Sequence, residues 1–167
     1  DAEILADVSE YEGMENIKDS YVDIAEALEI VPTDGTYIVP YMANAAGILY
    51  NRDMFEEHGW EIPTTWDELM SLCEEIQAEG ILPFYFGFRD TWTCLAPWNG
   101  IAVDLAPADL CKQVNRGEAT FTEGYKEAAE KYIQLMEYGP ADPAAYGYND
   151  ACTAFARGES AMYPIGS

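Results

Sequence analysis

The sequence predicts an α/β fold, in which helices alternate with short strands. Apolar residues recur at helical spacings of three and four in several segments, and short apolar runs of strand length lie between these segments. Glycine, proline, asparagine and aspartate separate the two kinds of segment, as expected for turns. With 49% hydrophobic and 13% aromatic residues, a chain of 167 residues can bury the core of about one domain.

Before residue 46 the sequence predicts one helix and one short strand. Apolar residues recur at helical spacing from Asn16 to Leu28. The turn sequence PTDG at residues 32–35 follows this pattern, and its glycine can adopt a positive φ. The apolar residues 37–39 then predict a short strand.

From residue 46 onward the predicted elements alternate. Strands are predicted at residues 47–51, 82–87 and 160–164, and the main helices at residues 66–79 and 122–138. Short helices are predicted at residues 53–58, at residues 108–115 and after Asn149 or Asp150, either of which can cap the last one, whereas residues 89–100 are predicted to be irregular.

The helix ends carry specific signals. Thr65 and Thr120 are each followed three residues later by a glutamate, which predicts a capping box at both helix starts. Gly59, Gly80 and Gly158 are expected to end helices, Gly158 in a left-handed conformation. Helical spacing also predicts a buried face on the two long helices, made of Leu69, Leu72, Ile76, Tyr132, Ile133 and Met136.

The composition is strongly acidic. Asp and Glu number 31 and Lys and Arg number 8, which gives a formal net charge of −23. This charge argues against binding to nucleic acid or to an anionic membrane, and it disfavours anionic ligands. No apolar run approaches the about 18 residues of a membrane span, and the start lacks signal-peptide character. Because the chain opens at Asp1, we expect that an upstream segment has been removed.

Motifs of metal sites and catalytic sites are absent from the sequence. The four cysteines, Cys73, Cys94, Cys111 and Cys152, form no CxxC pair, so we expect free, mostly buried thiols, although three disulfide pairings are possible. The chain has no GxSxG, HExxH, GxxxxGKS/T or GxGxxG motif. Its single histidine, His58, is expected at a helix C-terminus. We therefore predict no catalytic residue, no metal ligand and no cofactor.

Polar and aromatic residues gather at the predicted strand ends. Asp90 and Trp92 follow the strand at residues 82–87, and Trp98 comes shortly after them. Tyr41 and Asn44 lie in the uncharged link before the strand at residues 47–51. In open α/β sheets ligands bind beyond the carboxyl ends of strands. An aromatic face beside a carboxylate and an amide suits a sugar, although core packing of the rings and a turn role for Asn44 remain the alternatives.

The order of several segments resembles the extracellular solute-binding proteins of ABC sugar importers, the family that includes maltose-binding-protein-like proteins. The segments that carry the resemblance are YIVP at residues 37–40, GILYNRDMF at 47–55, PTTWDEL at 63–69, GILPF at 80–84, and the closing FxxGESAM at 155–162. The resemblance covers nearly the whole chain, and the ordered combination of these motifs is more specific than any one of them.

The resemblance implies a partial two-lobe fold of the periplasmic-binding-protein type II kind, mostly its second lobe. Residues 1–43 would be a remnant of the amino-terminal lobe and its crossing strand, and residues 44–167 a partial second α/β lobe. Members of the family are more than twice as long and hold the ligand between their lobes. By position in the pattern, Asn44, Asp90 and Trp92 would contact the ligand, and Gly166 and Ser167 would lead to an aromatic that packs on it, whereas Tyr41 and Trp98 are added from their chemistry alone.

The resemblance implies non-enzymatic binding of an extracellular sugar or oligosaccharide and its delivery to an ABC transporter permease. The protein would be a cell-surface lipoprotein or a periplasmic protein, without cofactor, nucleic-acid partner or membrane span. Two alternatives stay open. One is a carbohydrate hydrolase with two carboxylates facing each other across a cleft. The other is a lobe that acts only as a protein-interaction module, which should expose an apolar patch.

Overall fold

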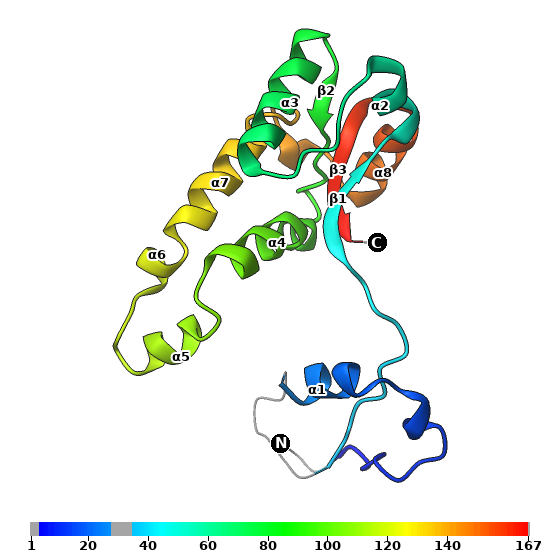
Figure 1. Ribbon diagram of the computed structural model, residues 1–167, viewed down its shortest axis with the longest axis vertical. Helices are drawn as coiled ribbons and strands as arrows, with labels where there is room; N and C mark the ends of the chain where they lie inside the picture. Colours follow the sequence, from blue (N-terminus) through cyan, green and yellow to red (C-terminus); the bar gives the residue numbers. More distant parts are fainter. Residues whose placement is uncertain (1–3, 28–34, 167) are drawn as a thin grey trace. The chain divides into compact units, whose positions relative to one another are not determined.

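A computed structural model of the protein describes residues 4–27 and 35–166 (Figure 1). The chain divides into two compact units, residues 1–44 and residues 45–167. Their assignment to two lobes of a larger protein stays a prediction.

The first unit contains the predicted helix but not the predicted strand. A 3-10 turn at Met14–Asn16 precedes the helix α1, Asp19–Ala27, which has no buried residue. Residues 37–39 form no strand, since no other strand lies among the described residues of this unit to accept their hydrogen bonds. Leu28 and most of the predicted turn at residues 32–35 lie outside the described residues.

The second unit is built on a mixed three-stranded sheet. The strands are β1, Ala46–Tyr50, β2, Leu82–Phe84, and β3, Ser160–Gly166, in the order β1-β3-β2 (Figure 1). The central strand β3 pairs antiparallel with β1 and parallel with β2. All three strands predicted from residue 46 onward are confirmed. However, β2 is half the predicted length. The Tyr85 N–H still donates to the Met162 carbonyl of β3, but Phe88 and Arg89 bond to the carbonyls of Pro143 and Tyr146 instead.

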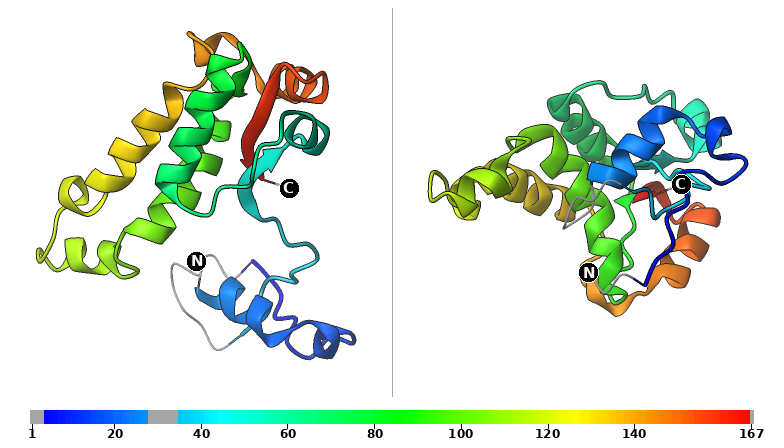
Figure 2. Two further views of the ribbon diagram at one scale, coloured as in Figure 1. Left: turned by 45° about the horizontal axis from the view of Figure 1, so that its top comes forward. Right: turned by 90° about the horizontal axis from the view of Figure 1, so that it is seen from below.

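Helices of the second unit pack on this sheet or on one another. They are α2, Arg52–His58, α3, Trp66–Ala78, α4, Leu95–Leu105, α5, Leu110–Asn115, α6, Phe121–Gly124, α7, Lys126–Met136, and α8, Tyr148–Ala156, with 3-10 turns at Thr91–Cys94 (η2) and Pro143–Ala145 (η3). Helices α4 and α7 run side by side (Figure 2). The indole N–H of Trp66 on α3 donates to Gln134 on α7 at 2.9 Å, which joins these two helices.

The helix ends follow the predicted signals closely. Thr65 Oγ1 accepts from the Glu68 N–H at 3.2 Å, and Glu68 Oε2 accepts from the Thr65 N–H at 3.1 Å, so the capping box of α3 is confirmed. Thr120 also caps its helix, but the Glu123 carboxylate accepts from the Thr120 hydroxyl and not from its backbone. The predicted glycines Gly59, Gly80 and Gly158 have φ values of +74°, +80° and +74°.

Three predicted helix positions were wrong. Residues 89–100 are not irregular but form η2 and the start of α4, because Pro97 lies in the first turn of α4, where its missing N–H is not needed. The single helix predicted at residues 122–138 is divided at Tyr125 into α6 and α7. The last helix starts at Tyr148, before Asn149 and Asp150, so neither of these is its N-cap.

The predicted core is correct on α3 and displaced on α7. Leu69, Leu72 and Ile76 are buried at 8%, 6% and 0% exposure. On α7 the buried residue is Leu135, whereas Ile133 is 61% exposed, so its predicted burial was wrong. Tyr132 and Met136, also predicted to be buried, are half-buried. Packing against α4 and α3 selects the face with Ala128, Tyr132 and Leu135, one position away from the face favoured by hydrophobicity alone.

The four cysteines are free thiols, but most are not buried. Cys73 is fully buried on α3, and burial raises the pKa of its thiol to about 12. Cys94 and Cys152 are half-buried and Cys111 is exposed. The free state matches the prediction, whereas the expected burial holds for one thiol only.

Candidate functional site

One edge of the sheet brings together the segments that the sequence singled out. Gly166, at the end of β3, pairs with Ala46, at the start of β1, because these strands are antiparallel. The chain leaves β2 toward the same edge, since β2 runs parallel to β3. The strands β1 and β2 are not direct neighbours, because β3 lies between them.

Beyond this edge the segment after β2 is joined to the segment before α8. We call these two segments, residues 85–92 and 143–150, the loop junction. The Phe88 N–H donates to the Pro143 carbonyl and the Arg89 N–H to the Tyr146 carbonyl, both at 3.0 Å. Gly87 and Gly147 are buried where the two backbones meet, and a Cβ atom on Gly87 would lie 2.8 Å from the Gly147 carbonyl oxygen. The junction therefore needs glycine at this contact.

Asp90 lies in the loop junction, where its carboxylate has a structural partner. Asp90 Oδ2 accepts the Tyr148 backbone N–H at 2.7 Å, at the start of α8. Carboxylates are favoured at helix N-termini, where backbone N–H groups lack partners within the helix. No described residue is hydrogen bonded to Asp90 Oδ1, so this oxygen can accept a further donor.

Trp92 presents its ring to solvent beside a second aromatic residue. Its side chain belongs to η2, is 56% exposed, and has its ring centroid 5.0 Å from that of Tyr148. The Thr93 hydroxyl is buried and donates to the carbonyls of Gly87 and Asp90, which fixes the turn that carries Trp92. Tyr148 was not among the predicted site residues. No local pattern identifies it, because its contact with Trp92 joins residues that are distant in the sequence.

Trp98 takes part in helix packing. It is half-buried on α4, with its ring 5.5 Å from Tyr125 and 5.9 Å from Tyr132. Tyr132 in turn donates its hydroxyl to the Cys94 carbonyl, and burial raises the pKa of this phenol. These contacts turn Trp98 toward α7, and the structure does not bring it together with Trp92 in one ring cluster.

The other predicted site residues are dispersed over the chain. Tyr41 and Asn44 belong to the first unit, where Tyr41 is 90% exposed and lines a pocket of about 290 Å³ together with Tyr21. Gly166 is the exposed end of β3, and Ser167 lies outside the described residues. A single cleft wall formed by Asn44, Asp90 and Trp92 stays a prediction.

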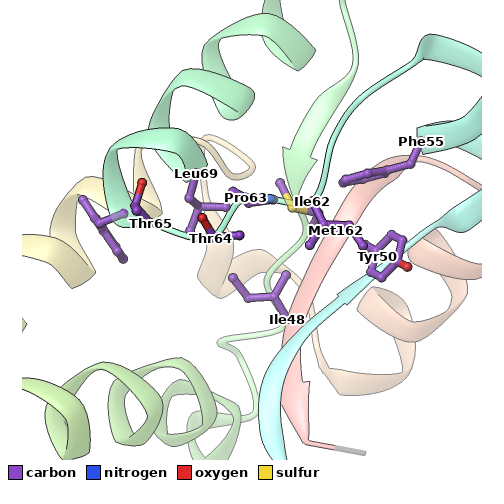
Figure 3. Close-up of a pocket in the computed structure, with 10 residues that line it drawn as sticks. Ile48, Tyr50, Phe55, Ile62, Pro63, Thr64, Thr65, Leu69 and Met162 are labelled. Carbon is purple, nitrogen blue, oxygen red and sulfur yellow. The ribbon is translucent and has the colours of Figure 1, made fainter.

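Two adjoining pockets lie elsewhere, on the face of the sheet that β1 exposes. One, of about 370 Å³, lies between β1 and the start of α3 and is lined by Ile48, Tyr50, Phe55 and Leu69 among others (Figure 3). The other, of about 460 Å³, extends between β1, α4 and α7. In the first pocket the hydroxyl of Thr65 serves the α3 cap, so this wall offers few free polar groups to a sugar.

The described residues show little that could support a metal or an acid–base centre. No group of three or more His, Cys, Asp or Glu side chains among them could hold a metal ion. His58 ends α2, as predicted, and its Nδ1 bonds to Glu79 Oε2 while its ring stacks on Trp60. None of the described helices is long and apolar enough to cross a membrane.

The whole chain matches the family of bacterial extracellular solute-binding proteins, over residues 1–167, and the chain belongs to this family. The resemblance found in the sequence is thereby confirmed. Members of this family are solute-binding proteins and not enzymes.

Curated relatives come from bacteria and archaea. The chain is 34% identical over 140 residues to the "Multiple sugar-binding protein" of Streptococcus mutans. The matched segment covers 78% of this chain and 33% of that protein. It is 25% identical over 156 residues to an uncharacterized ABC transporter extracellular-binding protein of Pyrococcus horikoshii, covering 91% and 35%. The chain therefore spans about a third of the length of these relatives.

Solved structures confirm the predicted fold class. The apo form of RafE from Streptococcus pneumoniae is 31% identical, with a TM-score of 0.74 over 98% of this chain and 43% of RafE. RafE is also known in complex with raffinose. A sugar transporter protein of Bacillus licheniformis, in complex with stachyose, has a TM-score of 0.76 at 20% identity, which supports the fold alone, over 95% and 42% of the two chains. The present fold is thus a partial periplasmic-binding-protein-like α/β fold.

Proposed function

We propose that this chain is part of a receptor that binds an extracellular sugar or oligosaccharide and delivers it to an ABC transporter permease. The protein would act at the cell surface as a lipoprotein or in the periplasm. Support comes from the family, from a relative that is named as a sugar-binding protein, and from a similar structure that holds raffinose. The observation that carries the proposal is the exposed ring pair of Trp92 and Tyr148 beside the Asp90 carboxylate, beyond the carboxyl end of β2.

This arrangement matches the two chemical faces of a sugar. The C–H face of a pyranose ring is apolar and packs on an aromatic ring, for which the exposed Trp92 offers area. The hydroxyl groups need directed acceptors, and Asp90 Oδ1 is one within the same turn. Bonds to an ionised acceptor are stronger than neutral ones, so the carboxylate would fix the orientation of the ring.

The same observations favour binding over hydrolysis. A glycosidase needs two carboxyl groups about 5–9.5 Å apart across the scissile bond, one of them with a raised pKa. Asp150 is the acid nearest to Asp90 in the loop junction, and it is already paired with Arg89. Among the described carboxyl groups, the resolved pKa shifts of Asp7 and Glu68 are both downward, caused by hydrogen bonds from Ser9 and Thr64. The apolar face at β1 would also suit a protein-interaction module, so this face does not distinguish a sugar receptor from such a module.

The test is calorimetric titration of the full-length protein with a panel of neutral oligosaccharides that includes raffinose and stachyose. We expect binding to at least one of them, and we expect Trp92→Ala to weaken it by at least about fivefold, the loss of roughly 1 kcal/mol of aromatic contact. Phe121→Ala is the matched control, because Phe121 is also an exposed aromatic, at 49%, but lies on α6.

Two results would contradict the proposal. Absence of binding to every neutral sugar would refute carbohydrate recognition. Unchanged affinity of Trp92→Ala would remove the assignment of this site while the family membership stands.

A further inference from the structure

We propose that Arg89 is the positioning residue of the sugar site: its guanidinium holds the N-terminus of α8 so that Tyr148 stays against Trp92. This inference rests on the proposed function and names a residue that does not itself contact the sugar. It arises from the loop junction, where Arg89 makes more connections between the two segments than any neighbouring side chain described.

Arg89 bonds to three different residues of the opposite segment. Its backbone N–H donates to the Tyr146 carbonyl at 3.0 Å. In its side chain, Nη1 donates to the Ala145 carbonyl at 3.2 Å and Nη2 to Asp150 Oδ2 at 2.7 Å. The planar guanidinium can serve two acceptors in fixed directions at once, which the point charge of a lysine cannot do.

The partners of Arg89 lie on both sides of Tyr148. Asp150 Oδ2, which accepts from Arg89, also accepts the Gly147 N–H at 2.9 Å, in the turn that starts α8. Tyr148 is the next residue, and its own N–H donates to Asp90 at 2.7 Å. Arg89 and Asp90 are adjacent in the sequence. Asp90 therefore holds the Tyr148 N–H directly, and Arg89 supports the Gly147 N–H through Asp150.

The Arg89 and Asp90 side chains, which together hold the start of α8 and which we call the clamp, lie close to the Gly147 backbone. A Cβ atom on Gly147 would lie 2.7 Å from Arg89 Nη2 and 2.8 Å from Asp90 Oδ2. The guanidinium and the carboxylate thus pass directly over the Gly147 backbone. This glycine has a φ of −93°, an extended value open to any residue, so a larger side chain here would meet no backbone strain but would displace the ends of the Arg89 and Asp90 side chains.

The clamp is exposed, so its expected effect is on binding more than on stability. The side chains of Arg89 and Asp150 are 59% and 48% exposed. Exposed ion pairs add little to folding stability, because both ions are well solvated when apart. Misplacing the Tyr148 ring by removal of the clamp, however, changes the surface that meets the ligand.

The test compares the full-length protein with R89Q, R89K and the control R157Q, using the sugar that the wild type binds best. Arg157 is an exposed arginine at the other end of α8, away from the loop junction. We expect R89Q to lower sugar affinity by at least about fivefold, with a melting temperature close to that of the wild type. R89K should retain only part of the wild-type affinity, and R157Q should bind sugar like the wild type.

Hydrogen exchange of the Tyr148 amide supplies a readout that does not depend on sugar. We expect faster exchange in R89Q than in the wild type and in R157Q, because the bond from this amide to Asp90 loses its support. Wild-type affinity or unchanged Tyr148 exchange in R89Q would overturn the positioning role. Absence of sugar binding by the wild type itself would refute the proposed function, whatever the exchange data show.

Discussion

Truncation of Leu135 to alanine should destabilise the protein far more than truncation of Ile133, although both are large aliphatic residues on α7. Leu135 is 2% exposed and belongs to the core that includes Ile76 and Phe86. Replacing a buried leucine by alanine removes its transfer free energy and leaves a cavity, which together cost about 2–5 kcal/mol. We expect a loss in this range for Leu135→Ala.

The loss for Ile133→Ala follows from its exposure of 61%. Full burial of an isoleucine side chain is worth about 1.5–3 kcal/mol, and only about two-fifths of that burial is present here. The resulting loss of roughly 0.6–1.2 kcal/mol is partly offset, since alanine gains up to about 0.7 kcal/mol in helix propensity. The net effect should therefore stay below about 1 kcal/mol.

Urea unfolding followed by circular dichroism measures both changes. With an m-value of about 2 kcal/mol/M, Leu135→Ala should lower the midpoint by about 1 M or more, and Ile133→Ala by less than about 0.5 M. An equal or larger loss for Ile133→Ala would show that α7 buries the face favoured by hydrophobicity alone. The placement of α7 against α3 and α4 would then be wrong.

Three further predictions concern the cap of α3 and the thiols. Thr65→Ala should cost about 1 kcal/mol, because Thr65 Oγ1 accepts the Glu68 N–H, and an unchanged melting curve would contradict the cap. Hydrogen bonds from the backbone and hydroxyl of Thr64 lower the pKa of Glu68 in the folded protein. The ionised Glu68 therefore stabilises the fold above the pKa of an unfolded glutamate, about 4.3, and this stabilisation is lost as the pH falls through the lower pKa of the folded state. A pKa of Glu68 at or above about 4.3, measured by NMR titration, would refute this. At pH 8 a thiol reagent should modify the exposed Cys111 quickly and leave Cys73 intact until the protein unfolds, because burial raises the Cys73 pKa to about 12; equal rates would contradict that burial.

Local structure could be predicted well because its causes lie within a few residues. The Thr65 capping box and the left-handed Gly158 each depend on bonds between residues no more than five apart in the sequence. The family could be inferred for the same reason, since its motifs mark a strand end, a helix start and a helix end. Where local signals were weak the prediction failed: residues 89–100 were predicted to be irregular, yet they form η2 and the start of α4.

The sequence was less informative about the candidate site. Asp90 and Trp92 were selected because they follow an apolar strand, and the structure places them together in the loop junction. Trp98 was selected on the same basis, but it packs on α7. Tyr148 and Arg89 were not selected. Tyr148 is bonded to Asp90, 58 positions away, and Arg89 to Asp150, 61 positions away, and nothing near these residues in the sequence indicates such distant contacts.

By itself the sequence determined the three strands of the second unit, most helix boundaries and the family, because turn glycines, capping side chains and apolar runs act on their immediate neighbours. Only the tertiary structure decided the strand order β1-β3-β2, the buried face of α7 and the meeting of Trp92 with Tyr148. These features depend on contacts between residues far apart in the chain. Their free energy comes from packing and backbone bonding across elements, which no local pattern of residue types specifies.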